Sequence, residues 1–155
     1  MRLLPALLLF LAAPAFAGED DHHHAEAPEG LEIGHGWMAA TEGPDARVFV
    51  RVHNETGEDL VLTAVEVEGA EAVLVAPAID GSGGTAPLLP YPLDADAELE
   101  MTPEGPHIAI TGLGPRAEGE AFDLVLAFEG LGEIEAHVDV EGPDAESESH
   151  AGHNH

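Results

Sequence analysis

Apolar and polar residues alternate through most of residues 31–142, and this period of two constrains the fold more than any other feature of the sequence. In "GEIEAHVDV" (132–140), every second residue from the isoleucine onward is aliphatic, and the residues between them are Glu, His and Asp. Successive side chains of a β-strand point to opposite faces. The pattern therefore predicts a strand with one buried and one solvated face.

The same alternation recurs in short segments that are separated by turn clusters such as "NETGED" and "DGSGG". Strands this short and closely spaced, with no convincing helix, predict an all-β domain built as an antiparallel β-sandwich or barrel. The further strands are expected over residues 36–40, 46–53, 60–67, 71–76, 97–101, 107–111 and 121–128.

Charged segments flank this domain on both sides. Residues 31–142 have the size of one ordinary domain, whereas residues 18–30 and 143–155 contain no large apolar residue. Segments of that composition bury too little apolar surface to offset the loss of chain entropy. We therefore expect a disordered tail at each end of the domain.

The first residues have the pattern of a secretory signal peptide over residues 1–17, in which Arg2 precedes an apolar run that ends in "AFA". Cleavage after Ala17 would give a periplasmic or secreted protein. The run contains Pro5 and Pro14 and is shorter than the about 20 residues of a membrane span, so no span is expected after cleavage. The chain has no cysteine, which argues against disulfides and against a lipid attached through cysteine.

Acidic residues dominate the charge, with 31 Asp and Glu against four Arg and no Lys, and a formal net charge of -27. Nucleic acid and anionic membranes are poor partners for such a protein. The charge fits a general acidic bias and also a field that attracts metal cations. The absence of Cys and Lys excludes thiolate and Schiff-base chemistry, and no nucleophile and base stand out as a pair, so no enzyme activity is expected.

Several segments of the domain, taken in order, resemble the PCu(A)C family of periplasmic copper chaperones. They are "GHGWMAAT", "ARVFVRVHNETGEDLVLTAVEV", "LEMTPEGPHIAITGLGPRAEGEAFDLVLAF" and "FDLVLAFEGLGEIEAHVDVEG", which together cover roughly residues 33–141. The resemblance implies a cupredoxin-like sandwich that binds Cu(I) through two histidines and two methionines, because soft thioethers suit the reduced ion. One His and one Met of that set form a His-x-Met pair, whose side chains share one face of a strand.

This sequence keeps one of the ligands that the resemblance implies. His107 matches the histidine of the His-x-Met pair, and Ala109 replaces the methionine. Val75 or a close neighbour stands where the first histidine is expected, and residues 85–88 contain no methionine. Met101 precedes His107 by six residues and is expected to pack in the core or a turn. One imidazole without thioethers is a poor Cu(I) site, so we predict that the inherited site is degenerate.

Six of the ten histidines lie in the two charged tails. Imidazoles bind Cu(II), Zn(II) and Ni(II), and a flexible His-rich tract can wrap around an ion without a preformed cage. We therefore predict that these tails bind metal, with or without His107, and that copper is the metal, with Zn and Ni as alternatives. Polar tails without a metal role remain the other interpretation. The tail histidines are His22, His23, His24, His150, His153 and His155.

The remaining histidines have ordinary structural explanations. His137 lies on the acidic, outward face of its strand, where a solvated side chain is expected. His53 ends a strand, where a hydrogen bond in the turn is expected, and Asn54 is expected to make that turn. His35 begins "HGWM", whose Trp and Met fit the core, although a His and a Met so close together would also suit a soft metal.

Two interpretations of function follow. The first is an exported copper-chaperone-like protein that binds copper or another divalent metal, or hands it over, in the periplasm. The resemblance implies a metal ion as partner, and as acceptor a periplasmic metalloprotein such as a cytochrome oxidase subunit or another copper chaperone. The alternative is a protein-interaction module without metal, on a copper-chaperone fold that has lost its site.

Overall fold

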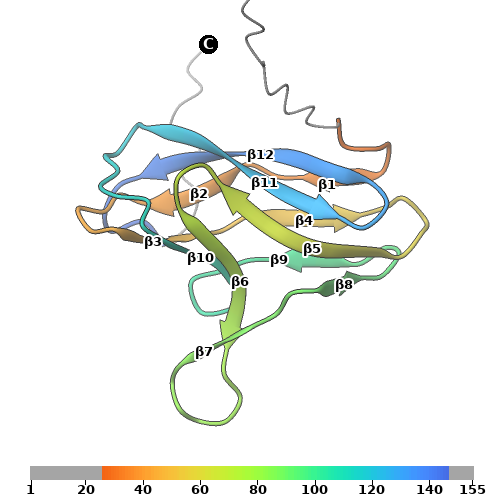
Figure 1. The fold of residues 1–155 in the computed structure, drawn as a ribbon, viewed down its shortest axis with the longest axis horizontal. Coiled ribbons are helices and arrows are strands. Elements are labelled where there is room, and N and C mark those ends of the chain that lie inside the picture. Colours follow the sequence, from red (N-terminus) through yellow and green to blue (C-terminus); the bar gives the residue numbers. More distant parts are fainter. Residues whose placement is uncertain (1–25, 147–155) are drawn as a thin grey trace, which may run out of the picture.

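The computed structural model describes residues 26–146, which form twelve β-strands and no helix (Figure 1). The predicted signal peptide (1–17) and most of each predicted tail (18–30 and 143–155) lie outside the described residues. No helix in the described part of the chain is long and apolar enough to cross a membrane. The strands are β1 (Leu31–Ile33), β2 (Gly36–Ala39), β3 (Asp45–Val48), β4 (Arg51–Asn54), β5 (Leu60–Val67), β6 (Glu71–Pro77), β7 (Thr85–Pro87), β8 (Tyr91–Leu93), β9 (Glu98–Glu100), β10 (His107–Thr111), β11 (Ala121–Phe128) and β12 (Gly132–Glu141).

The strands pair into three sheets that pack as a sandwich around one core (Figure 1). Their strand orders are β2-β12-β11-β5-β8, β3-β10-β6-β7 and β1-β4-β9. The pairs are antiparallel except for β12 with β2, which run parallel. The predicted all-β sandwich is confirmed, and the parallel pair is a feature that the alternation of residues does not reveal.

Alternation fails in the middle of the predicted strand 46–53, where Phe49 and Val50 are both buried. The chain changes sheets there: β3 belongs to the four-stranded sheet and β4 to the three-stranded sheet. Phe49 forms a bridge to Trp37, with backbone hydrogen bonds of 3.0 and 2.9 Å in the two directions. The change of sheet ends one strand and begins the next, so the expected single strand is two strands.

Three strands of three residues each, β1, β7 and β8, lie outside the predicted set. Each lies at the edge of its sheet, and both β7 and β8 contain a proline. Proline cannot donate a hydrogen bond to a neighbouring strand and is tolerated at edges. Segments this short give too few alternations to be recognised from sequence.

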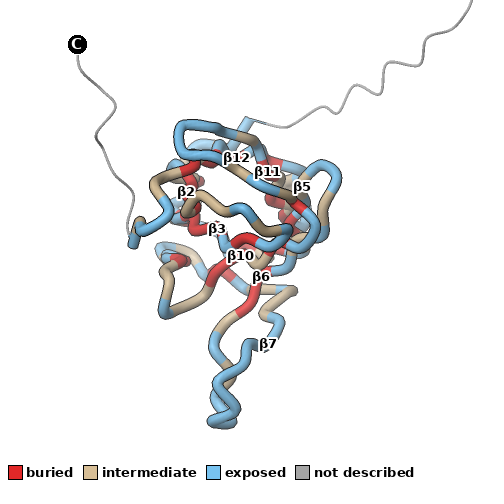
Figure 2. The backbone as a smooth tube through the Cα atoms, turned by 90° about the vertical axis from the view of Figure 1, so that its left-hand side faces the viewer, coloured by how far each residue is buried: buried red, intermediate tan, exposed pale blue. Residues whose placement is uncertain are grey.

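Side chains from all three sheets contribute to the core. Figure 2 shows the buried residues concentrated inside the sandwich and exposed residues along β7 and the loop that precedes it, which extend away from the sandwich. Met38 is fully buried, and Trp37 and Met101 are nearly so. These three residues therefore pack in the core. This was expected for Met101, and for Trp37 and Met38 it agrees with core packing, one of the two interpretations of "HGWM". Removing a side chain of this size from water contributes about 1.5–3 kcal/mol.

Candidate functional site

His107 opens β10 and is almost fully buried, with 7% of its surface exposed. Its Nδ1 lies 3.1 Å from the carbonyl oxygen of Gly105, and its ring centroid lies 6.2 Å from that of Phe49. When Nδ1 donates its proton to this carbonyl, Nε2 is the ring nitrogen with a free lone pair. A neutral His107 can therefore offer one nitrogen to a metal, from a buried position.

Ala109 lies with the other expected ligand positions around one open hollow, which we call the Val73 hollow. Ala109 pairs with Val73 of β6, and Val75 on the same strand pairs with Pro87 of β7. The side chains of the hollow include one carboxylate and neither an imidazole nor a thioether, so they do not supply the soft ligands that suit Cu(I). The hollow is lined by Glu71, Ala72, Val73, Val75, Thr85, Pro87, Ala109 and Thr111.

The six tail histidines, His22, His23, His24, His150, His153 and His155, lie outside the described residues. Their part in metal binding therefore remains a prediction.

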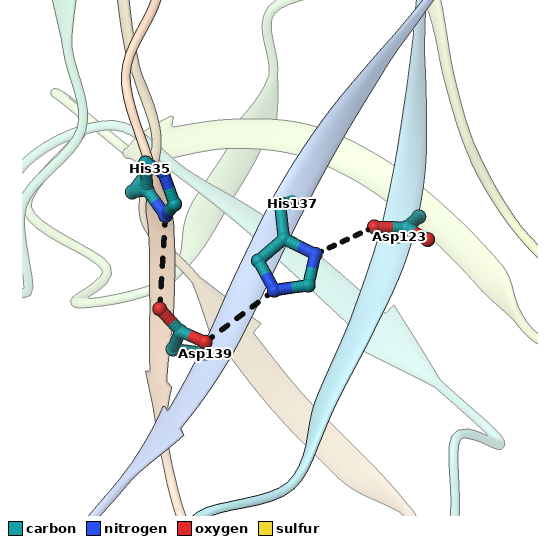
Figure 3. Close-up of polar contacts among 4 residues, drawn as sticks. All are labelled: His35, Asp123, His137 and Asp139. Atoms are coloured by element: carbon teal, nitrogen blue, oxygen red, sulfur yellow. Dashed lines mark hydrogen bonds and ion pairs between the residues drawn. The ribbon is translucent and has the colours of Figure 1, made fainter. Parts of the chain in front are cut away.

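The structure brings together two histidines that the sequence does not connect, and we call the group of His35, Asp123, His137 and Asp139 the His137 cluster (Figure 3). Nδ1 of His137 lies 2.8 Å from Oδ1 of Asp123, and Nε2 of the same ring lies 3.5 Å from Oδ1 of Asp139. Nδ1 of His35 lies 3.7 Å from Oδ2 of Asp139. The two imidazole rings meet edge to face, with centroids 5.8 Å apart.

Strand register explains how this cluster forms. His137 and Asp139 are two residues apart on β12 and share its outer face, and Asp123 is the direct partner of His137 on β11. The parallel pairing of β12 with β2 sets Val138 beside Gly36, so His35 comes to lie next to His137. The sequence signal for this site was the His-x-Asp pair on the outward face of the last strand, whereas the contribution of His35 needs the tertiary pairing.

Charge around His137 favours its protonated form. Its pKa is raised above the ordinary value, chiefly by the hydrogen bond to Asp123. Burial opposes this as the next largest effect, and the negative charges of Asp123, Asp139 and Glu135 add to the rise. The predicted solvated side chain is therefore half-exposed and held by two carboxylates. In its neutral form, such an imidazole between carboxylates has the donor set that divalent transition metals prefer.

A second group of possible metal ligands consists of Glu32, His53 and Glu55, whose ligand atoms all lie within 4.8 Å of one another. Glu32 pairs with His53 across β1 and β4, and Nδ1 of His53 lies 3.9 Å from Oε1 of Glu55. His53 thus faces carboxylates, and the hydrogen bonds of the turn are made by Asn54, as expected for that residue. This group offers one imidazole where the His137 cluster offers two.

Comparison with solved structures finds PCuAC domains with a similar fold. The apo PCuAC domain of PmoF2 superimposes with a TM-score of 0.65 at 23% identity, covering 81% of this chain and all 100% of that domain. The copper-bound PCuAC domain of PmoF2 has a TM-score of 0.58 at 22% identity, and the match covers 77% of this chain and 99% of that domain. The Cu(I) form of DR1885 from Deinococcus radiodurans has a TM-score of 0.60 at 18% identity, and the match covers 77% of this chain and 83% of DR1885.

These likenesses establish the class as an all-β domain with the cupredoxin-like PCuAC fold, which confirms the fold that the resemblance implied. The LpqE-like family model matches residues 31–140, and the chain belongs to that family. The family description names a lipoprotein, while this sequence contains no cysteine. No curated protein matches the chain in sequence.

Proposed function

We propose that this protein is an exported metal-binding protein that binds copper and hands it over in the periplasm. The observation that supports this most is the fold, which extends over residues 31–140 and is shared with PCuAC domains that include a copper-bound one. A copper-chaperone role needs no catalytic machinery, in keeping with the absence of Cys and Lys from the sequence. Copper is then the cargo of this protein.

The copper ligands in this proposal are the six tail histidines, with or without His107. The Val73 hollow, where the resemblance implies the remaining ligands, has Ala109 and aliphatic side chains in their place. A single buried imidazole at its edge would bind Cu(I) weakly, since the soft thioethers are missing. The inherited site has therefore degenerated in this proposal, and copper binding has moved to flexible imidazoles, which can wrap around an ion.

The partners follow from the same role. The acceptor would be a periplasmic metalloprotein, such as a cytochrome oxidase subunit or another copper chaperone, and the strongly negative surface would attract cations and repel nucleic acid. The proposed location, periplasmic or secreted, rests on residues 1–17 as a cleaved signal peptide.

Copper titration of the chain without residues 1–17 tests this function. Cu(I) under reducing conditions, and Cu(II) or Zn(II) without reductant, are added against a competing chelator. Bound metal is measured for three proteins: the parent, a variant with all six tail histidines changed to alanine, and His107→Ala. We expect the tail variant to lose most of the bound metal and His107→Ala to lose little. His53→Ala, which removes a domain histidine away from the Val73 hollow, is the control.

Two results would contradict the assignment. If His107→Ala abolished binding while the tail variant kept it, the inherited site would still be the working one. If no form of the protein bound copper, the alternative function would stand: a protein-interaction module on a copper-chaperone fold. The apolar Val73 hollow, with Val73 itself 39% exposed, is the feature that favours that alternative.

A further inference from the structure

The His137 cluster places a ring nitrogen of His137 opposite the carboxylate of Asp139 on a half-exposed face of the sheet. The short contact of 2.8 Å shows that Nδ1 of His137 donates its proton to Asp123. In the neutral ring, Nε2 then presents a lone pair toward the carboxylate of Asp139, at 3.5 Å. Two electron-rich atoms that face each other need a cation between them, either a proton on the ring or a metal ion.

The spacing of Nε2 of His137 and Oδ1 of Asp139 suits two ligands of one metal ion. Around an ion with ligands at about 2.0–2.1 Å, the ligand atoms of a tetrahedral site lie roughly 3.3 Å apart. The carboxylate of Asp139 lies 3.5 Å from Nε2 of His137 and 3.7 Å from Nδ1 of His35. The separation between Nε2 of His137 and Oδ1 of Asp139 is too long for a strong hydrogen bond and close to the spacing between two ligands of one ion, whereas His35 approaches the other oxygen of the same carboxylate (Figure 3).

Asp123 supplies the support that metal-binding histidines commonly have. A ligating imidazole usually donates its second N–H to a carboxylate, which fixes the tautomer and the ring orientation. Asp123 does this for Nδ1 of His137 from the neighbouring strand. His137, Asp139 and Asp123 therefore lie on two paired strands of one sheet, which hold them in fixed relative positions.

His35 is the adjustable member of the group. It belongs to the link of two residues between β1 and β2, and its side chain is 66% exposed. Its ring contacts within the described residues are those with Asp139 and His137. The group of described residues whose ligand atoms already lie within 4.8 Å of one another is Glu32, His53 and Glu55. The side chain of His35 therefore has to rotate to bring its nitrogen onto an ion held by His137 and Asp139.

We propose that the His137 cluster is a binding site for a divalent transition-metal ion, Cu(II) or Zn(II), with His35, His137 and Asp139 as ligands and Asp123 as the residue that orients His137. Two imidazoles and one carboxylate suit these ions, with Cu(II) favoured over the other first-row divalent metals. The ligand atoms of Glu32, His53 and Glu55 already lie within 4.8 Å of one another, but that group offers only one imidazole. The proposed ligands include neither His107 nor any tail histidine, so this proposal does not depend on their role in copper binding.

Zinc titration followed by NMR tests this site in the chain without residues 1–17. Zn(II) is diamagnetic, so the imidazole nitrogens and backbone amides report each site separately, including the tails. Up to one equivalent, we expect the ring nitrogens of His35 and His137 to shift together with the amides of Asp123 and Asp139. We expect His137→Gln to remove these shifts, and Asp123→Asn to weaken zinc binding by about 10- to 100-fold.

His53→Gln is the matched control, because it removes one imidazole from the other carboxylate group and leaves the His137 cluster intact. The shifts at His137 should persist in this variant. Zinc shifts confined to the tail histidines, or shifts in the domain that survive His137→Gln, would overturn the proposal. Loss of the domain shifts in His53→Gln alone would assign zinc to Glu32, His53 and Glu55 instead. The spectra also show directly whether each variant is folded.

Discussion

Asn54 is the buried polar residue that we expect to matter most for stability. It is completely buried at the end of β4. Its Nδ2 lies 2.8 Å from the carbonyl oxygen of Glu58 and 3.0 Å from those of Leu93 and Asp94, so one amide joins the β4–β5 turn to the end of β8. Its Oδ1 accepts hydrogen bonds from the backbone N–H of Thr56 and from Oγ1 of Thr56, at 3.1 and 2.6 Å.

The cost of Asn54→Ala can be estimated from these contacts. The carbonyl of Leu93 lies in the buried part of the network, and leaving it without a donor costs about 1–3 kcal/mol. The other hydrogen bonds are partly exposed and contribute about 0.5–1.5 kcal/mol each. The amide has only two protons for its three acceptors, so these three contacts count as two hydrogen bonds. Added together, the contributions give an expected loss of about 4 kcal/mol in the free energy of unfolding.

Urea denaturation measures this loss, with an unchanged m-value showing that the two-state transition is preserved. Asn54→Asp is the matched variant, because it keeps the acceptor for Thr56 and removes only the amide donor. It should also destabilise strongly, whereas Thr56→Ala should cost about 1 kcal/mol. If Asn54→Ala cost no more than Thr56→Ala, the idea that this amide holds the two loops together would be wrong.

Two further changes test other parts of the fold. In Gly36→Ala the new Cβ would lie 2.9 Å from a methyl of Val138 and 3.0 Å from one of Val50. We therefore expect urea denaturation to show a free energy of unfolding lower by about 1–3 kcal/mol. An unchanged free energy would show that the sheets can shift apart there. Hydrogen bonds from Ser82 hold the pKa of Asp80 below its usual value, so Ser82→Ala should raise that pKa, and an unchanged carboxyl midpoint by NMR would contradict this. Because a lowered carboxyl pKa stabilises the fold above the unfolded-state pKa, the advantage of the parent over Ser82→Ala should disappear as the pH falls through the folded pKa of Asp80.

Where a strand is long and half-buried, its bounds could be predicted from the sequence. The predicted strands 60–67 and 121–128 coincide with β5 and β11, because each has enough alternating residues to define a buried face. The turn at Asn54 was also predicted, since Asn favours turns by bonding to nearby backbone groups. Its bonds to Leu93 and Asp94 were not, because those residues are 39 and 40 positions away in the chain.

Pairing between distant strands explains what could not be predicted. Phe49 lies where the chain passes from one sheet to another, and alternation describes only one strand in one sheet. The exposed face of β12 could be predicted, and with it the outward direction of His137. Its partner Asp123 depends on the register of β11, and its neighbour His35 depends on the parallel pairing of β2.

The sequence by itself determined the all-β class and the charged composition of the segments on either side of residues 31–142, and it predicts that three of the four ligands that the PCu(A)C resemblance implies are missing. These properties depend on residue types and on local alternation, which are present in the chain before it folds. Only the tertiary structure decided that Ala109, Val73 and Pro87 surround one apolar hollow and that His35 meets His137 beside two aspartates. Both arrangements depend on strand register, which is fixed when the buried faces of distant strands pack into one core.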